Sequence, residues 1–170
     1  MKALEAIDLE KLIGATEKEG KGRTVIWQDS ESIAFLSRGR KRRMDFHVDP
    51  SDEVTLQLRG EQRLHYLTAE GDEKVVVLNP GQTTLCPGGM PHSPRVSEDA
   101  WFIVFERVRK SGEEDRFMWF CEDCGEKVYE VGVKVGDYSA DPVGQVHANF
   151  YGDETLRTCK ACGSIIPKPE

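Results

Sequence analysis

Several features that place proteins in large classes are missing from this chain. Its apolar runs fall far short of the roughly 18–20 residues that a bilayer-spanning helix needs, which excludes a transmembrane segment. Residues 1–15, MKALEAIDLEKLIGA, carry acidic side chains where a signal peptide needs an apolar stretch, so we predict no export. Basic residues are in deficit, with 23 Lys and Arg against 30 Asp and Glu and a net charge of −7. Because such a chain repels phosphate groups, we expect no nucleic-acid partner.

Cysteines are few, and their number, five, is odd. Without a secretion signal, an odd number argues against a disulfide framework. Four of the five form two C-x-x-C pairs, Cys121 with Cys124 and Cys159 with Cys162. These pairs indicate metal binding in a reducing compartment, so we predict a cytoplasmic protein. Cys86 stands alone, and we interpret it as a small core residue.

The length of 170 residues suits one domain with a small appendage. We predict three parts: an N-terminal helix and linker over 1–22, an all-β barrel over 23–112 and a cysteine-bearing extension over 113–170. In the first part Leu4, Ile7 and Leu12 share one helical face, and Gly14 is a plausible stop. A linker rich in Gly, Lys and Glu then covers 15–22.

Short runs rich in Val, Ile, Leu, Thr and aromatic residues fill the second part, with Gly, Pro, Asn and Asp between them. The runs predict strands at 24–28, 33–37, 54–58, 63–68, 74–78, 83–86 and 101–108. Many short strands with no helical stretch between them indicate an antiparallel sandwich or barrel.

The two cysteine pairs predict a structural metal site in the extension. A glycine follows each pair, Gly125 and Gly163, and allows a turn in which backbone N–H groups approach sulfur. Four thiolates in a tetrahedron suit zinc, with iron as the lesser option, and leave no open position for a substrate. The segment 125–158 between the pairs exceeds the roughly 15–20 residues of a zinc ribbon, so it must form a small folded insert. The alternative is four buried or redox-active cysteines.

A second candidate metal site is formed by two histidines 45 positions apart, His47 and His92. Two imidazoles with one carboxylate hold non-haem Fe(II) by one face and leave positions open for substrate and oxygen. The residues alone leave the carboxylate undecided among Asp49, Asp52 and Glu53. The remaining histidines, His65 and His147, we interpret as ordinary surface or core residues.

The segments around these histidines resemble the paired motifs of the cupin superfamily, G-x5-H-x-H-x3-4-E-x6-G and G-x5-P-x-G-x2-H-x3-N. Three positions depart from the motifs: Lys41 stands for the first Gly, Asp49 for the second His and Val96 for the final Asn. The resemblance implies a cupin barrel, also called a double-stranded β-helix or jelly roll. It also implies that the iron ligands are His47, Glu53 and His92.

Further strings extend the resemblance over nearly the whole chain. They are Ile26-Trp27-Gln28-Asp29-Ser30, Arg43-x-Asp-Phe-His47, Gln57-Leu-Arg-Gly60, His92-Ser-Pro94, Glu106-Arg107 and Trp119-Phe-Cys121. Together with the two metal sites they resemble the bacterial 3-hydroxyanthranilate 3,4-dioxygenase family, whose members append a rubredoxin-like four-cysteine site to the barrel. The resemblance implies an Fe(II)-dependent, extradiol-type opening of 3-hydroxyanthranilate by O₂ to 2-amino-3-carboxymuconate semialdehyde, carried out by a homodimer.

The resemblance also implies roles for polar residues of the pocket. Arg43 matches an arginine near the substrate and oxygen, and Glu106 matches a carboxylate that is a candidate for proton handling. Arg95 matches, across a one-residue gap, the arginine that pairs with the ring carboxylate, where a bidentate fork suits the partner.

Two departures leave the substrate open. Arg23 stands where the family carries a substrate-contacting asparagine, and Val54, Thr55 and Leu56 stand where it carries aromatic residues. A basic run also leads into the metal motif: Arg38, Arg40, Lys41, Arg42 and Arg43. These features suit a more anionic or differently substituted aminophenol or catechol carboxylate, which is one alternative. A non-enzymatic cupin that binds a small aromatic acid is the other.

Overall fold

Two antiparallel sheets form the body of the computed structural model, which describes residues 4–39 and 43–169. The first sheet has the strand order β1 (Arg23–Trp27), β2 (Ser32–Arg38), β9 (Trp101–Arg107), β4 (Glu53–Arg59), β7 (Thr83–Cys86). The second has the order β11 (Lys127–Val133), β10 (Asp115–Phe120), β3 (Asp45–Val48), β8 (His92–Val96), β5 (Gln62–Leu67), β6 (Glu73–Leu78). The predicted all-β class is confirmed.

All seven predicted strands are present, with ends shifted by at most one residue. The sequence patterns did not predict β3, β8, β10 and β11. Strand β3 has only four residues, and it is buried along its whole length although Asp45 and His47 are polar. Strand β8 contains Pro94, which is unusual inside a sheet.

Helix α1 (Leu9–Lys18) differs from the prediction at both ends. The side chain of Asp8 caps its start by accepting a hydrogen bond from the Lys11 N–H at 3.1 Å. Leu4 and Ile7 precede the cap and are exposed, so they are not part of a buried helical face. The predicted stop at Gly14 is wrong, because the helix continues through it and buries Thr16 as well as Ile13.

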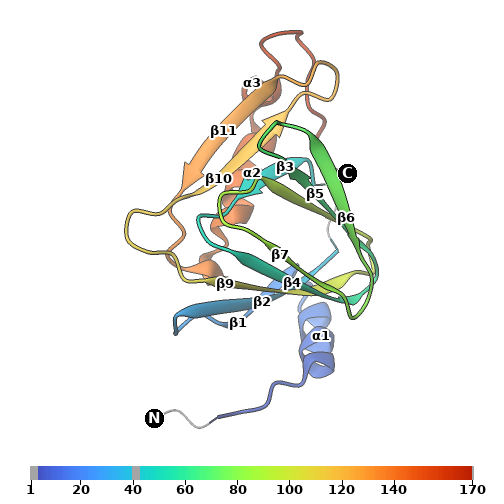
Figure 1. The fold of residues 1–170 in the computed structure, drawn as a ribbon, viewed down its shortest axis with the longest axis vertical. Coiled ribbons are helices and arrows are strands. Elements are labelled where there is room, and N and C mark those ends of the chain that lie inside the picture. The colour runs from blue at the N-terminus through green and yellow to red at the C-terminus, as the bar shows by residue number, and fades with distance from the viewer. Residues whose placement is uncertain (1–3, 40–42, 170) are drawn as a thin grey trace.

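Alternation along β9 places its residues on two different faces. Trp101 and Ile103 pack with Ile13 of α1 on one face of the first sheet. Phe102, Val104 and Glu106 point to the other face, where they line the cavity between the sheets. In Figure 1 helix α1 lies below β1 and β2, on the side away from the second sheet.

The chain beyond the barrel continues the second sheet before it forms helices. Strand β10 pairs with β3, with Phe117 opposite His47. The predicted folded insert between the cysteine pairs consists of β11, the 3-10 helix η1 (Tyr138–Ala140), α2 (Pro142–Gly152) and α3 (Glu154–Arg157). Helix α2 packs on β10 through stacked rings of Phe150 and Trp119, whose centroids are 4.1 Å apart. The proposed boundary at 112/113 falls in the turn before β10.

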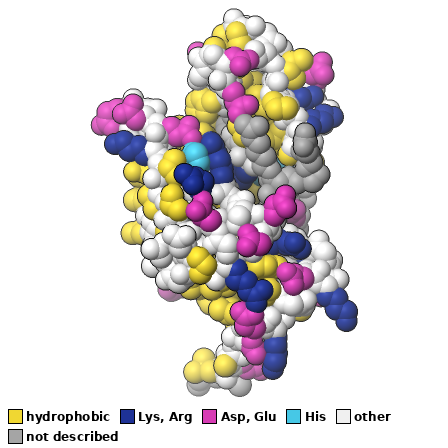
Figure 2. All heavy atoms as spheres, turned by 90° about the vertical axis from the view of Figure 1, so that its right-hand side faces the viewer, with side chains coloured by type: hydrophobic (Ala, Val, Ile, Leu, Met, Phe, Trp, Pro, Cys, Tyr) yellow, Lys and Arg dark blue, Asp and Glu magenta, His cyan; other side chains and the backbone are white. Residues whose placement is uncertain are grey.

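Charges on the outside are mixed. On the face shown in Figure 2, acidic and basic side chains lie interspersed rather than separated by sign. None of the helices in the described part of the chain is long and apolar enough to cross a bilayer.

Candidate active site

The three predicted iron ligands lie close together, each on a different strand. His47 of β3 is directly opposite His92 of β8, and their ring centroids are 5.3 Å apart. Glu53, the first residue of β4, places Oε2 3.5 Å from Nε2 of His92. One ligand atom from each of the three lies within 4.8 Å of the others, and all three residues are buried. Two imidazoles and one carboxylate at this spacing fit Fe(II) with positions left open.

The charges of this cluster also fit a divalent cation. Burial opposes ionisation of Glu53, yet His92, His47 and Arg43 lower the pKa of this carboxyl to about 2. Burial lowers the pKa of His47, which favours the neutral ring that binds metals. Against burial, Glu53 raises the pKa of His92 well above its usual value. A cation bound between His92 and Glu53 would take the place of this proton.

Of the other acidic candidates, neither Asp49 nor Asp52 falls in a group with both histidines among the described residues. Asp49 groups with His47 and Asp115, and with Glu53 and Glu106, and its Oδ2 lies 2.6 Å from a guanidinium nitrogen of Arg109. Asp52 accepts a hydrogen bond from the Gly88 N–H at 2.9 Å. Glu53 is therefore the carboxylate that the structure places close to both histidines.

Each histidine has further partners besides the other two predicted ligands. Nδ1 of His92 lies 3.1 Å from the Met90 carbonyl oxygen and 3.3 Å from Sγ of Cys86. Nε2 of His47 lies 2.8 Å from Oδ2 of Asp115, and its ring stacks on Phe117. Such outer partners fix the orientation of metal-binding rings. The sequence analysis missed these contacts of Cys86 and Asp115, because they connect strands that are distant in the sequence.

Arg43 lines the cavity and is held by a buried carboxylate. It donates two hydrogen bonds to Asp45, at 3.0 Å from Nε and 2.8 Å from Nη2. His147 of α2 places Nε2 3.2 Å from Oδ1 of the same aspartate. Although burial opposes it, Arg43 and His147 hold the pKa of Asp45 below its usual range. His147, interpreted from the sequence as an ordinary residue, therefore lies on the wall of the cavity.

Glu106 lies beside the iron-ligand cluster, because it is directly opposite Glu53 across β9 and β4. The Tyr138 hydroxyl donates to Oε2 of Glu106 at 3.2 Å, and a guanidinium nitrogen of Arg109 is 2.5 Å from the same oxygen. Burial, and then Asp49, raise the pKa of Glu106 well above its usual value. The raised pKa favours the protonated form of this carboxyl. Neither Tyr138 nor Arg109 gave a signal in the sequence.

The cavity has a volume of about 1090 Å³ and lies between the two sheets. Its wall carries both signs of charge rather than positive charge alone. The arginines are Arg23, Arg38, Arg43, Arg63 and Arg95, and the acids are Asp45, Glu53, Glu61, Glu98, Glu106, Asp115 and Asp141. From the basic run of the sequence, Arg40, Lys41 and Arg42 lie outside the described residues.

Arg23 and Arg95 also line the cavity. Arg23 pairs with Asp141 at 2.7 Å, and its guanidinium lies over the Phe35 ring. Arg95 pairs with Glu73 at 3.3 Å, while its buried Nε has no hydrogen-bond partner among the described residues.

The non-aromatic residues after Glu53 contribute little to the cavity. Thr55 is the one that points inward, and its hydroxyl donates to Oε1 of Glu53 at 3.3 Å. Val54 and Leu56 alternate to the opposite face of β4, and none of the three lines the cavity. At these positions the chain therefore adds no side chain to the lining of the cavity.

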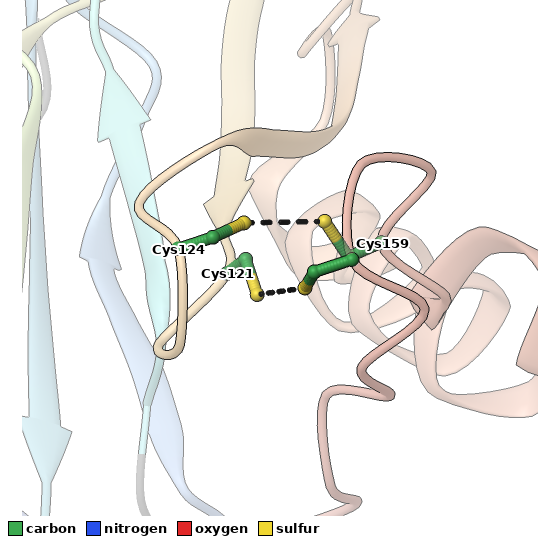
Figure 3. A group of neighbouring side chains, drawn as sticks. Cys121, Cys124 and Cys159 are labelled. Carbon is green, nitrogen blue, oxygen red and sulfur yellow. Dashed lines mark hydrogen bonds between the residues drawn. The ribbon is translucent and has the colours of Figure 1, made fainter.

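The four paired cysteines form a second cluster. Sγ of Cys121 lies 3.6 Å from that of Cys162, and Sγ of Cys124 lies 3.6 Å from that of Cys159. In a tetrahedron with Zn–S bonds of about 2.3 Å, sulfurs are separated by about 3.8 Å, so the cluster fits a four-thiolate metal site. Figure 3 shows the sulfurs pointing toward one another from two facing turns.

The two cysteine turns are built alike. The N–H of Gly125 donates to the Cys121 carbonyl and that of Gly163 to the Cys159 carbonyl, at 2.9 and 2.8 Å. Both glycines have positive φ angles, 75° and 80°, which favour glycine at these positions. Hydrogen bonds from the Ser164 side chain and backbone lower the pKa of the Cys162 thiol to about 6.

Known proteins that are similar to this chain come from the family that its sequence motifs resemble. Residues 1–151 match the family model of 3-hydroxyanthranilic acid dioxygenase. The chain is 38% identical over 170 residues to a 3-hydroxyanthranilate 3,4-dioxygenase of Bacillus thuringiensis, covering 98% of this chain and 94% of the relative. The chain belongs to the 3-hydroxyanthranilic acid dioxygenase family. A relative of the same name from Burkholderia lata is 37% identical over 147 residues, which is 86% of this chain and 83% of that one.

Solved structures support the cupin fold of this 3-hydroxyanthranilic acid dioxygenase family member. A cupin-2 domain protein from Shewanella frigidimarina superposes with a TM-score of 0.50 at 16% identity, covering 59% of this chain and 93% of that one. A Neisseria meningitidis protein gives the same TM-score at 18% identity, covering 61% and 99%. The predicted family, fold and dioxygenase class are confirmed, whereas the roles of single residues stay predictions.

Proposed function

We propose that this chain opens the aromatic ring of 3-hydroxyanthranilate by inserting both atoms of O₂, with Fe(II) held by His47, Glu53 and His92. The product would be 2-amino-3-carboxymuconate semialdehyde. The observation that carries the proposal is the buried cluster of these three ligands beside the cavity, in a chain of the 3-hydroxyanthranilic acid dioxygenase family. Iron bound there would supply a Lewis-acidic centre at which an aromatic substrate and oxygen meet.

The charged residues of the cavity support this chemistry by binding and orienting the substrate. We assign the substrate carboxylate to Arg95, whose Nε has no hydrogen-bond partner in the described part of the chain and whose Nη2 is paired with the half-exposed Glu73. A planar carboxylate matches the fork of a guanidinium. Arg43, fixed by its two bonds to Asp45, keeps a positive charge beside the ligand cluster.

Glu106 is the group that we assign to proton handling. Its carboxyl is buried beside Glu53, has a pKa raised well above its usual value by burial and then by Asp49, and receives a hydrogen bond from the Tyr138 hydroxyl. A carboxyl of raised pKa can donate a proton to a developing anion or hold one taken from the hydroxyl or amino group of the substrate.

The same reaction on another aminophenol or catechol carboxylate is the second candidate. Arg23 favours it, because the side chain lines the cavity where the family resemblance places an asparagine. Its charge is shared with Asp141, so a substrate with an additional anionic group would have to compete with that ion pair. The non-enzymatic alternative is set aside, since the chain belongs to a dioxygenase family.

The test is anaerobic loading with Fe(II), followed by air and a panel of 2-aminophenols and catechols. We expect oxygen uptake and a conjugated semialdehyde from 3-hydroxyanthranilate, with the highest kcat/KM of the panel. Arg23→Asn should change the ranking of the panel only if the second candidate is right. Absence of turnover over the whole panel contradicts the proposed function.

The finer properties of the protein belong to the same proposal. We assign zinc or iron to the four cysteines, and metal analysis of protein purified without added metal distinguishes the two. Four free cysteines at one site favour a reducing compartment such as the cytoplasm.

We also expect a homodimer, which sedimentation analysis tests. The exposed apolar side chains of edge strand β6, Val75, Val76 and Val77, offer a surface for it.

A further inference from the structure

Arg109 is a buried cation that the reaction outlined above does not use. It follows β9, and its side chain is only 3% exposed. Nε lies 2.5 Å from Asp115, Nη2 lies 2.6 Å from Asp49, and Nη1 lies 2.5 Å from Glu106. One guanidinium thus joins three carboxylates that come from different parts of the chain.

Two of these carboxylates face the active site. Oδ2 of Asp115 accepts from Nη2 of Arg109 at 2.8 Å and lies 2.8 Å from Nε2 of the iron ligand His47. Oε2 of Glu106 is shared between Nη1 of Arg109 and the Tyr138 hydroxyl. The guanidinium therefore connects the support of His47 with the carboxyl to which we assign proton handling.

The geometry requires an arginine rather than any cation. Each of the three guanidinium nitrogens contacts a carboxylate. Nη1 also donates to the Arg107 carbonyl at 3.0 Å and lies 3.3 Å from Oγ of Ser51. A planar fork can hold two carboxylates in fixed relative positions. The ammonium of a lysine is a single point charge that cannot span the same sites.

We propose that Arg109 is a positioning residue that orients His47 through Asp115 and sets the place of Glu106 in the cavity. This inference rests on the proposed function for the role of Glu106, but its effect on His47 concerns metal binding alone. Partners of metal-binding histidines typically change metal affinity or activity by about 10–100-fold.

The first test is the affinity for Mn(II), a metal that suits imidazole and carboxylate ligands better than four thiolates, so that the cysteine site does not interfere. Free Mn(II) is measured by electron paramagnetic resonance in titrations of the full chain. We expect Arg109→Lys and Asp115→Asn each to weaken binding by about 10-fold or more. Because both changes act through Oδ2 of Asp115, the double variant should lose less than the product of the two single losses.

The second test is the split between kcat and KM of the Fe(II)-loaded enzyme with 3-hydroxyanthranilate. We expect Arg109→Lys to lower kcat about 10-fold or more, with a smaller change in KM, because Arg109 does not line the cavity. Arg107→Lys is the matched control. Arg107 binds Glu113 through two bonds of 2.7 Å on the surface and should leave both quantities unchanged.

The outcomes separate the two proposals. A folded Arg109→Lys variant with wild-type Mn(II) affinity and kcat overturns the positioning role. If this variant does not fold, the isosteric Asp115→Asn decides, and unchanged Mn(II) affinity there overturns the role as well. If the wild-type enzyme shows no turnover, the proposed function fails, while the Mn(II) titrations still test the support of His47.

Discussion

Glu106 and Glu113 both pair with an arginine, yet their carboxyl groups have opposite properties. Glu106 is buried among other acids beside Arg109, and its pKa is raised well above the usual value. Glu113 is more exposed and receives two hydrogen bonds from Arg107, which lower its pKa to about 2. At the scale of single residues, desolvation and neighbouring charge thus decide whether the pKa of a carboxyl is raised or lowered.

Glu106→Gln tests the assignment of proton handling. The amide keeps the size of the side chain but cannot exchange a proton, so we expect kcat to fall about 10²–10⁴-fold. Iron content should remain at the wild-type level, because Glu106 is not one of the three ligands. The matched control is Glu113→Gln, with wild-type kcat expected. A Glu106→Gln enzyme with wild-type kcat would contradict the assignment.

Glu113 itself predicts a pH dependence of stability. Its pKa in the folded protein, about 2, is below the value of about 4.3 expected in the unfolded chain. The contribution of the ion pair is therefore present above about pH 4 and is lost as the pH falls toward 2. We expect Glu113→Gln to lower Tm at pH 7 and the difference from wild type to disappear near pH 2. A difference that does not depend on pH would refute this account.

At the scale of elements, the strands with alternating or β-branched patterns were predictable, whereas β3 and β8, which carry the two histidines, were not. Strands β4 and β9 show their character in the sequence, since both have regular apolar runs. Strand β3 is short and buried on both faces, and the proline in β8 hides its pairing with β5. The ligand set itself was reached through motif resemblance, whereas the Asp115–Arg109 contacts depend on long-range pairing that no local pattern records.

The insert between the cysteine pairs predicts a link between the tail metal and the pocket. Tyr138 of η1 and His147 and Tyr151 of α2 line the cavity, and the metal-binding turns enclose this insert on both sides. We expect Cys162→Ser to lower Tm and to raise KM for the substrate more than it lowers kcat.

Lys160→Ser changes an exposed residue of the same turn and is the control for this experiment. Steady-state kinetics and thermal unfolding of the purified variants provide the two measurements. Wild-type KM in a Cys162→Ser protein that has lost its tail metal would show that the insert is positioned without the metal, through the packing of Phe150 on Trp119.

At the scale of the whole molecule, two candidate metal sites of different chemistry lie in one chain. Histidine and glutamate side chains group beside a cavity between the sheets, and four cysteines group in the tail. The net charge of −7 gave no guide to the cavity, whose wall mixes arginines with acids. Composition could exclude a bilayer-spanning segment but could not show how the charges are distributed.

Independence of the two sites is testable by metal analysis. Removing an imidazole with His47→Ala should abolish binding of iron at the cavity, while the metal of the tail is retained. Cys124→Ser should instead remove the metal of the tail while iron at the cavity is retained. An unchanged iron content in a folded His47→Ala variant would refute the ligand assignment.

The central claim, a ring-opening dioxygenase, is tested most directly with isotopically labelled oxygen. The Fe(II)-loaded enzyme is given 3-hydroxyanthranilate under ¹⁸O₂, and the mass of the ring-opened product is measured immediately. We predict that both labelled atoms enter one product molecule. A single labelled atom in the product, or consumption of oxygen without ring opening, would contradict this claim.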